Sequence, residues 1–208
     1  MKVLDIFSGT GSVSKICEKL GYTCTSIDIS DKYHKPTILC DIMKWNYKQF
    51  SPKHFDIIFA GVPCTEYSIL NSANKHVKTP DVKGANKVSR RTLNIIKYLQ
   101  PKIWFIENPD SGTLKEQSFM KNLPYYRVSY CKYGFCYRKN TRIWTNLKGF
   151  NPKICHKDCG KMIGNKHMKI IGQRNDPSGQ TNVSNLQTKY AYPPKLIEEL
   201  LKLSKINS

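Results

Sequence analysis

Short apolar segments alternate with helical patterns along the first half of the chain. Residues 2–7 (KVLDIF) predict a first strand, and SGTG at residues 8–11 predicts a tight turn. After this turn, apolar residues recur at helical spacing until Gly21, at Val13, Ile16, Cys17 and Leu20. This spacing predicts a helix whose apolar face is buried.

The alternation continues to about residue 145. Further strands are expected at residues 23–28, 37–40, 55–60 and 102–106, and then at 125–131 and 141–145. A helix between the fourth and fifth strands is indicated by Val88, Thr92, Ile95, Ile96 and Leu99. Strands and helices in this order favour an α/β fold with a doubly wound, mostly parallel sheet.

The pattern changes after residue 145. Residues 146–188 are rich in Gly, Pro, Asn, Lys and His and show little periodicity, so we expect a small irregular insert. Residues 1–145 would form the main domain, and residues 189–208 a C-terminal helix that packs back on it. The apolar stripe of this helix consists of Leu196, Ile197, Leu200 and Leu201.

The charge balance points to a polyanionic partner. The 208 residues include 34 Lys and Arg against 15 Asp and Glu, a formal net charge of +19. Such a surplus predicts salt-dependent attraction to nucleic acid. The alternative is a basic surface that only keeps the protein in solution.

The apolar runs are too short to span a membrane, and the N-terminal residues do not form a signal peptide. We therefore expect an intracellular protein, cytoplasmic or nuclear and neither secreted nor membrane-bound, that is a monomer or a weak oligomer. Its eight cysteines are expected to be reduced.

Part of the insert has the composition of a metal site. Cys155, Cys159 and His167 are spaced as C-x3-C-x7-H, and His156 or Cys136 could supply a fourth ligand. Zinc would stabilise a segment that has few apolar residues to form a core of its own. The alternative, which we favour from the sequence, is that no metal binds and these side chains are packed or exposed.

Reactive side chains follow the ends of several predicted strands. The glycine-containing turn at residues 8–11, Asp28 and Asp41 describe an edge that can bind a nucleoside. Cys64 follows a Gly-Val-Pro corner at the end of the fourth strand, and Glu107 and Asn108 end the fifth. A thiolate beside a carboxyl group suits nucleophilic attack on a ring with acid assistance. Taken singly, Cys64 could be a packed thiol and Glu107 a surface carboxylate.

Four motifs in order, DIFSGTGS, VPC, IENP and RKNTRIW, resemble those of the cytosine-C5 DNA methyltransferases, in particular small viral and phage members with an abbreviated target-recognition region. The resemblance implies a fold of the class I S-adenosylmethionine-dependent methyltransferases, with residues 146–188 as the recognition insert. It implies that Cys64 attacks C6 of cytosine, Glu107 assists at N3, Asn108 holds the cysteine loop and Arg142 orients Glu107 and the base. The residues implied to bind S-adenosylmethionine are Phe7, Ser8, Gly9, Thr10, Gly11, Asp28, Ile29, Asp41, Ile42, Gly61 and Pro63.

The chain departs from the family pattern at three places. Pro109 replaces the valine that usually follows Glu-Asn, and only Arg142 matches the usual Gln-x-Arg-x-Arg motif. The last motif lacks its usual Gly-Asn pair, and we expect Tyr190 or Tyr192 to close the cofactor pocket instead.

DNA is the favoured substrate, and the target base would leave its stack to enter the pocket. Restriction protection, an orphan regulatory role and modification of a viral genome all fit such an activity. The alternatives are an RNA or free-nucleotide cytosine-C5 methyltransferase, or a non-catalytic nucleic-acid-binding protein that kept the fold. The short insert predicts a short target motif, unless a partner subunit recognises the sequence. The basic residues after Cys64 are expected to contact phosphate: Lys75, Lys78, Lys83, Lys87, Arg90 and Arg91.

Overall fold

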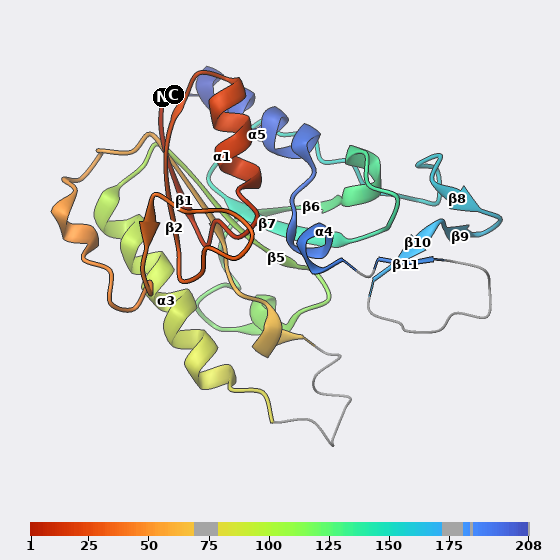
Figure 1. Ribbon diagram of the computed structural model, residues 1–208, viewed down its shortest axis with the longest axis horizontal. Coiled ribbons are helices and arrows are strands. Elements are labelled where there is room, and N and C mark those ends of the chain that lie inside the picture. Colours follow the sequence, from red (N-terminus) through yellow and green to blue (C-terminus); the bar gives the residue numbers. More distant parts are fainter. Residues whose placement is uncertain (69–78, 172–180, 184, 208) are drawn as a thin grey trace.

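The computed structural model describes residues 1–68, 79–171, 181–183 and 185–207, and seven of its strands form one sheet. They are β1 (Lys2–Ile6), β2 (Thr23–Asp28), β3 (Ile38–Leu39), β4 (Ile57–Gly61), β5 (Ile103–Pro109), β6 (Tyr125–Ser129) and β7 (Asn140–Thr145). Their order in the sheet is β3-β2-β1-β4-β5-β7-β6 (Figure 1).

The first five strands are parallel, and β7 is antiparallel to both of its neighbours. The predicted doubly wound, mostly parallel sheet is therefore confirmed. The strand order reverses between β1 and β4, and in open sheets of this kind ligands bind at the carboxyl ends of the strands beside such a reversal.

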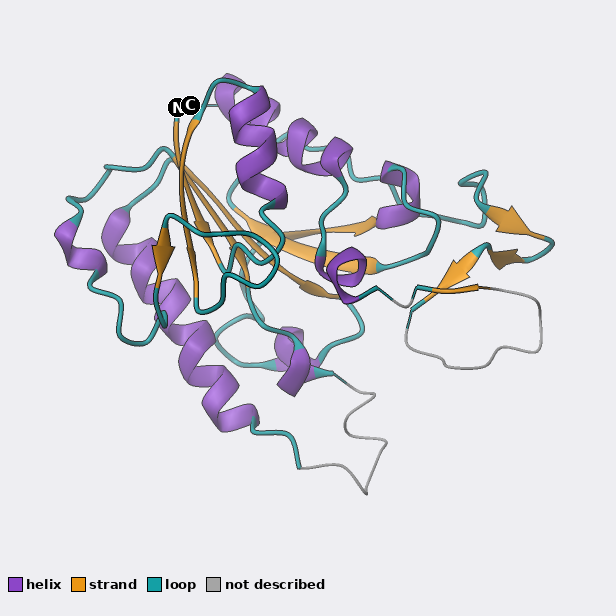
Figure 2. Ribbon diagram, viewed as in Figure 1, coloured by secondary structure: helices purple, strands orange, loops and turns teal. Residues whose placement is uncertain are grey.

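Helices cover both faces of the sheet (Figure 2). On one face, α1 (Ser12–Lys19) and α5 (Pro194–Ile206) pack over a core that includes Val3 and Phe59. On the other face, α3 (Val82–Leu99) packs over a second core that includes Leu4 and Ile58. Successive residues of β1 and β4 thus enter opposite cores, which explains why these strands are mostly apolar instead of alternating with polar residues.

Most of the predicted strand ends differ from the structure by a few residues, for example β4 and β5. The strand predicted at residues 125–131 ends at Ser129, because the chain turns into the 3-10 helix η4 (Tyr130–Tyr133), which ends at Gly134 with φ of 106°. At the start of the predicted insert, Leu147 and Phe150 lie in the core beneath α5. The other 3-10 helices are η1 (Tyr47–Gln49), η2 (Thr65–Tyr67) and η3 (Thr113–Glu116).

The described remainder of the insert contains short elements beside the main sheet (Figure 1). They are β8 (Met162–Ile163), β9 (Lys166–His167), β10 (Lys169–Ile170), β11 (Thr181–Asn182) and α4 (Leu186–Tyr190). Among the residues that the structure describes, we find no helix with the length and apolar character needed to cross a membrane.

Candidate active site

The turn after β1 is tied to the end of β2. The backbone N–H of Gly9 donates to Asp28 Oδ2 at 2.8 Å, and that of Ser30 donates to Asp28 Oδ1 at 2.9 Å. Phe7 and Gly9 both have positive φ, 62° and 47°. This conformation is unfavourable for a phenylalanine, and such backbone strain is typical of functional sites.

Two neighbouring cavities lie along the carboxyl ends of the strands. The β2–β3 cavity, about 150 Å³, is lined by Ile6, Phe7, Ile27, Asp28, Ile29, Cys40, Asp41, Ile42, Pro63 and Val88. The β4–β5 cavity, about 260 Å³, is lined by Phe7, Ser8, Gly9, Asp28, Ser30, Tyr33, Gly61, Val62, Pro63, Cys64, Thr65, Glu107, Pro109, Lys139, Tyr190 and Tyr192. Because Phe7, Asp28 and Pro63 line both, a single elongated ligand could occupy the two together.

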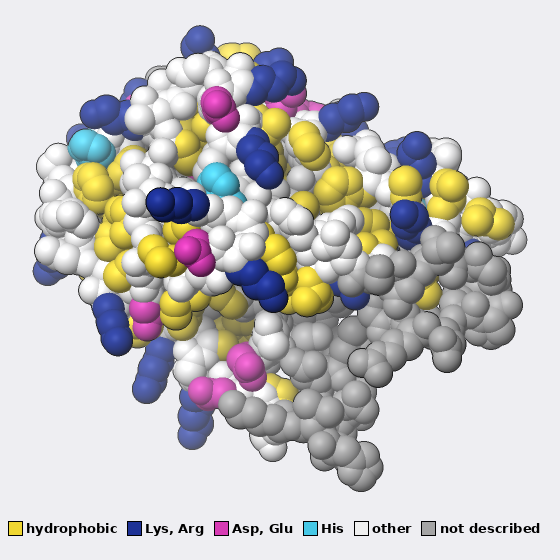
Figure 3. All heavy atoms as spheres, in the orientation of Figure 1, with side chains coloured by type: hydrophobic (Ala, Val, Ile, Leu, Met, Phe, Trp, Pro, Cys, Tyr) yellow, Lys and Arg dark blue, Asp and Glu magenta, His cyan; other side chains and the backbone are white. Residues whose placement is uncertain are grey.

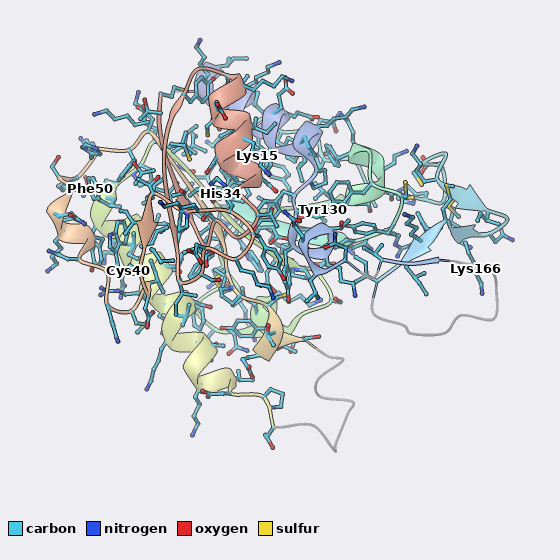
Figure 4. All side chains as sticks on the ribbon, viewed as in Figure 1. Lys15, His34, Cys40, Phe50, Tyr130 and Lys166 are labelled. Atoms are coloured by element: carbon cyan, nitrogen blue, oxygen red, sulfur yellow. The ribbon has the colours of Figure 1, made fainter. Side chains whose placement is uncertain are left out.

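Nine of the eleven predicted cofactor residues line one or both cavities, and Thr10 and Gly11 line neither. The Thr10 hydroxyl lies 2.8 Å from that of Ser12. Gly11 has φ of 68°, and a Cβ there would lie 2.5 Å from the ring of His34, which is labelled in Figure 4. These two residues shape the turn rather than the cavity walls.

Residues 61–64, the Cys64 corner, are held in place by contacts from the neighbouring strand β5. Gly61 on β4 is the register partner of Glu107 on β5, and the Asn108 side chain donates from Nδ2 to the carbonyl of Val62 at 3.0 Å. This is the contact that the resemblance implied for Asn108. After the corner, the hydroxyl of Tyr67 on η2 lies 2.9 Å from Ser89 Oγ on α3.

Glu107 is buried between two polar side chains that the sequence did not single out. The Tyr130 hydroxyl donates to Glu107 Oε1 at 3.0 Å, and Lys139 Nζ lies 3.6 Å from the same oxygen. Lys139 also lies over the Tyr130 ring, at 4.9 Å from its centroid. Tyr130 points into the interior from η4 (Figure 4). Lys139 belongs to the RKNTR motif, whereas no motif marked Tyr130.

The Cys64 thiol experiences opposing influences. Burial raises its pKa, the nearby Glu107 carboxylate raises it further, and Lys139 lowers it. The pKa of the thiol is raised overall, and the Lys139 ammonium is the side chain that favours the thiolate.

Two tyrosines from the C-terminal part of the chain close the β4–β5 cavity. Tyr192 is half-buried, and desolvation of its side chain raises the pKa of the phenol well above the usual value. Its hydroxyl fills the space beside Gly61, where an added Cβ would lie 1.8 Å away. Tyr190 lies against Tyr33, with ring centroids 6.2 Å apart. Both candidates named from the sequence thus line the cavity.

Arg142 does not contact Glu107, which corrects the role expected from the resemblance. In the antiparallel pairing of β5 and β7, Arg142 is opposite Asn108, and Glu107 is opposite Ile143. Directly opposed residues share a face, so the side chains of Arg142 and Glu107 leave the sheet on different faces. The Arg142 guanidinium donates from Nε to Asp110 Oδ1 at 3.0 Å.

The basic residues after Cys64 lie in different surroundings, and their contact with phosphate stays a prediction. Arg91 donates to the carbonyls of Ile42 and Trp45, and so it supports the backbone rather than facing solvent. Arg90 stacks on Phe119, with 4.2 Å from its Cζ to the ring centroid. Lys83 and Lys87 are exposed on α3, and Lys75 and Lys78 lie outside the described residues. Figure 3 shows Lys and Arg side chains spread around one face of the molecule, with few Asp and Glu side chains between them.

The insert contains a cluster that the sequence had only partly identified. Cys155, Cys159 and His167 come together with Cys131, a residue of η4. Neither of the two fourth ligands considered from the sequence, His156 and Cys136, belongs to this cluster.

The chain is similar in sequence to known proteins. Residues 1–123 match the family model of the C-5 cytosine-specific DNA methylases. A Frog virus 3 (isolate Goorha) protein named "Probable DNA (cytosine-5)-methyltransferase" is 36% identical over 98% of this chain and 100% of its own length. The type II methyltransferase M.HpaII of Haemophilus parainfluenzae is 31% identical over 50% of this chain and 30% of its own length.

One solved structure supports the fold alone. It is an E. coli chain titled "putative DNA modification methyltransferase encoded within prophage". It superposes with a TM-score of 0.52 at 18% identity, over 70% of this chain and 46% of that chain.

Proposed function

Because the chain belongs to the C-5 cytosine-specific DNA methylases and so transfers a methyl group to cytosine in DNA, we propose that S-adenosylmethionine is its methyl donor and that it acts through a covalent Cys64 adduct. The observation that carries this proposal is that Cys64 and Glu107 line one cavity together with Gly9 and Asp28 of the nucleoside-binding edge.

The residues present fit S-adenosylmethionine. The β2–β3 cavity offers apolar walls, Ile29 and Ile42, together with the carboxylates of Asp28 and Asp41. Such a lining suits an adenine ring and ribose hydroxyls. Gly61 would border the methionine end in the β4–β5 cavity. When bound, the cofactor supplies an electrophilic methyl group on a sulfonium.

Cys64 would begin the reaction. Its thiol proton would pass to the Glu107 carboxylate, while the Lys139 ammonium favours the thiolate, and the sulfur would form a bond to C6 of cytosine. The protonated Glu107 would then donate this proton to N3, so that the electron pair of the ring becomes available at C5 and no negative charge stays on N3. C5 would take the methyl group as the bond between that methyl carbon and the sulfonium breaks, which leaves a neutral thioether. Loss of the C5 proton to solvent, breaking of the C6–S bond and return of the N3 proton through Glu107 to the Cys64 thiolate would restore the aromatic ring and the resting enzyme.

The surrounding residues would position these two groups. Asn108 fixes the Cys64 corner through the Val62 carbonyl, and Tyr130 and Lys139 orient the Glu107 carboxyl group. Arg142 has no role at Glu107 in this proposal, because it pairs with Asp110. It would act only by holding the end of β5.

The chain would divide its tasks along the sequence. Residues 1–145 would bind the cofactor and carry the chemistry, residues 146–188 would contact DNA, and residues 189–208 would close the cavity and support α1. The target cytosine would leave its stack, because Cys64 and Glu107 line a recessed cavity. The reaction would take place inside the cell, where DNA and S-adenosylmethionine occur together.

The test uses tritiated S-adenosylmethionine with duplex DNA, RNA and dCMP as separate acceptors, followed by mass spectrometry of the product nucleosides. We expect 5-methyldeoxycytidine from DNA alone. A DNA duplex with 5-fluorocytosine at the target should form a covalent complex, because fluorine cannot leave C5 as a proton does. Cys64→Ser should lose both transfer and trapping and still bind the cofactor.

The matched control is Cys136→Ser, which changes a half-buried cysteine that lines neither cavity. It should transfer and trap normally. Full transfer by the Cys64→Ser variant would refute the covalent mechanism, and methylation of RNA or dCMP in place of DNA would refute the proposed role on DNA.

A further inference from the structure

Four potential metal ligands converge where the insert meets the main domain. One ligand atom from each of Cys131, Cys155, Cys159 and His167 lies within 4.8 Å of all the others. Cys155 Sγ and His167 Nε2 are 3.4 Å apart. Zinc–sulfur bonds of about 2.3 Å in a tetrahedron place neighbouring ligand atoms about 3.8 Å apart. Small side-chain adjustments would therefore bring the four atoms to a single ion.

The local backbone is shaped to bring these side chains together. Between Cys155 and Cys159, Lys157 has φ of 69°, and Gly160 follows with φ of 68°. These left-handed residues bend the loop back on itself, so that both thiols face the same side. The conformation is unfavourable for a lysine, which indicates that surrounding contacts hold it.

The loop is also fastened to η4, the element that carries Cys131. The Asp158 carboxylate accepts from Lys132 Nζ at 2.9 Å and from the backbone N–H of His156 at 3.0 Å. The backbone N–H of Cys155 donates to Ser129 Oγ at 3.1 Å. His167 reaches the cluster from β9, where it pairs with Met162 of β8. In Figure 4, sulfur atoms gather in this region between η4 and the β8–β9 hairpin.

The hairpin itself has little to stabilise it. Strands β8 and β9 have two residues each, and Ile163 in the hairpin is 53% exposed. An isolated two-stranded hairpin is at best marginally stable in water, and small segments without a core commonly depend on disulfides or metals. All eight cysteines of the chain are free thiols, so a disulfide does not fill this role.

From this arrangement we propose that Cys131, Cys155, Cys159 and His167 form a structural Zn²⁺ site that fastens the insert to the main domain. Three sulfur ligands and one imidazole, with no carboxylate among them, are the soft and borderline donors that zinc prefers. Four protein ligands leave no coordination position for water, which makes the site structural and not catalytic. Binding releases the thiol protons, and zinc holds the thiolates and the neutral imidazole.

The site would also support Glu107. Cys131 directly follows Tyr130, whose hydroxyl donates to Glu107 Oε1. Tyr130 and Cys131 both lie in the single turn of η4. An ion bound at Cys131 would therefore hold one end of this turn, and with it the position of the Tyr130 hydroxyl. The zinc site does not depend on the proposed reaction, because its ligands line neither of the two cavities.

The test measures metal in the full-length chain, purified under reducing conditions and reconstituted with Zn²⁺. Plasma mass spectrometry should find about one zinc ion per chain, as a four-ligand site requires. X-ray absorption should show three Zn–S bonds of about 2.3 Å and one Zn–N bond of about 2.0 Å. Replacing Zn²⁺ with Co²⁺ should give the thiolate-to-metal absorption and the intense visible bands of tetrahedral cobalt.

Matched substitutions distinguish the proposed ligands from other cysteine and histidine residues nearby. Cys159→Ser and His167→Ala should lose the bound metal, whereas Cys136→Ser and His156→Ala should keep it. Removing zinc with a chelator should lower the Tm of the parent protein and leave that of the Cys159→Ser variant unchanged. Folded parent protein that binds no Zn²⁺ on reconstitution would overturn the proposal. So would equal metal loss in the control variants, or a disulfide between two of the three cysteines under the same conditions.

Discussion

Replacing Lys139 with methionine should slow the reaction of the Cys64 thiol and move its pH dependence toward higher pH. Lys139 Nζ lies 3.6 Å from Glu107 Oε1, and the side chains are only 16% and 6% exposed. Two unit charges at this separation attract by about 4–5 kcal/mol at an effective dielectric constant of ~20. The same ammonium lowers the pKa of Cys64 against the effect of burial.

The size of the effect depends on how strongly Lys139 favours the Cys64 thiolate. Loss of about 1.4 kcal/mol of this interaction lowers the rate roughly tenfold at neutral pH. Removing a cation that favours the thiolate raises the thiol pKa further, so the rising part of the pH–rate profile moves to higher pH. The protein should also become less stable, by about 3–5 kcal/mol, because the buried Glu107 carboxylate is left without its partner.

The assay is alkylation of Cys64 by iodoacetamide as a function of pH, followed by peptide mass spectrometry, and parallel measurement of single-turnover methyl transfer. Lys139→Arg keeps the positive charge and should recover most of the alkylation rate. Lys121→Met is the matched control, since Lys121 is exposed and lines neither cavity. An alkylation profile of Lys139→Met that coincides with that of the parent protein would show that Lys139 does not control the thiol.

Four further predictions concern the site and its use. Glu107→Gln can still accept and donate hydrogen bonds at N3 but cannot transfer a proton, so kcat should fall by about 10²-fold; normal turnover would mean that N3 protonation is not needed. Gly61→Ala should destabilise the protein by about 1–3 kcal/mol in thermal unfolding, because its Cβ would lie 1.8 Å from the Tyr192 hydroxyl; the added change Tyr192→Phe should restore part of the loss, and no recovery would contradict this clash. Burial raises the pKa of Asp5 well above its usual value, so the folded parent protein binds a proton that the unfolded chain releases near pH 3.9. Its stability should therefore decline as the pH rises from about 4, whereas an Asp5→Asn variant should lack this decline; parallel unfolding curves across pH would reject the assignment. Finally, the short insert can place few side chains on base edges, so bisulfite sequencing should return a motif of about two to four base pairs, and a single strict site of six or more would indicate that a partner subunit recognises the sequence.

Much of the fold and of the site follows from the order of residues, because these features are local or fixed by parallel strands. The spacing of Val13, Ile16 and Cys17 sets the buried face of α1, and the positions of Cys64 and Glu107 at strand ends bring them to one edge of the sheet. Parallel neighbours end at the same edge, so the grouping of Gly9, Asp28 and the Cys64 corner needed no further information.

Tertiary structure decided which cation accompanies Glu107. Arg142 and Lys139 lie three residues apart in the same motif, and the motif alone favoured Arg142. The register of the β5–β7 pairing places Arg142 opposite Asn108, on the other face of the sheet from Glu107. Because successive strand residues alternate between faces, this register is what excluded the expected contact. Lys139 lies just before β7, and it reaches Glu107 across Tyr130.

Cys131, the fourth member of the cysteine and histidine cluster, could likewise not be predicted from the sequence. Cys155, Cys159 and His167 are close along the chain, and their spacing alone indicated them. Cys131 lies 24 residues before Cys155, and it joins them only because β6 ends at Ser129 and η4 turns toward the loop that Ser129 Oγ binds. Local spacing therefore determines ligands within one loop, whereas a ligand from another element depends on how the two segments pack.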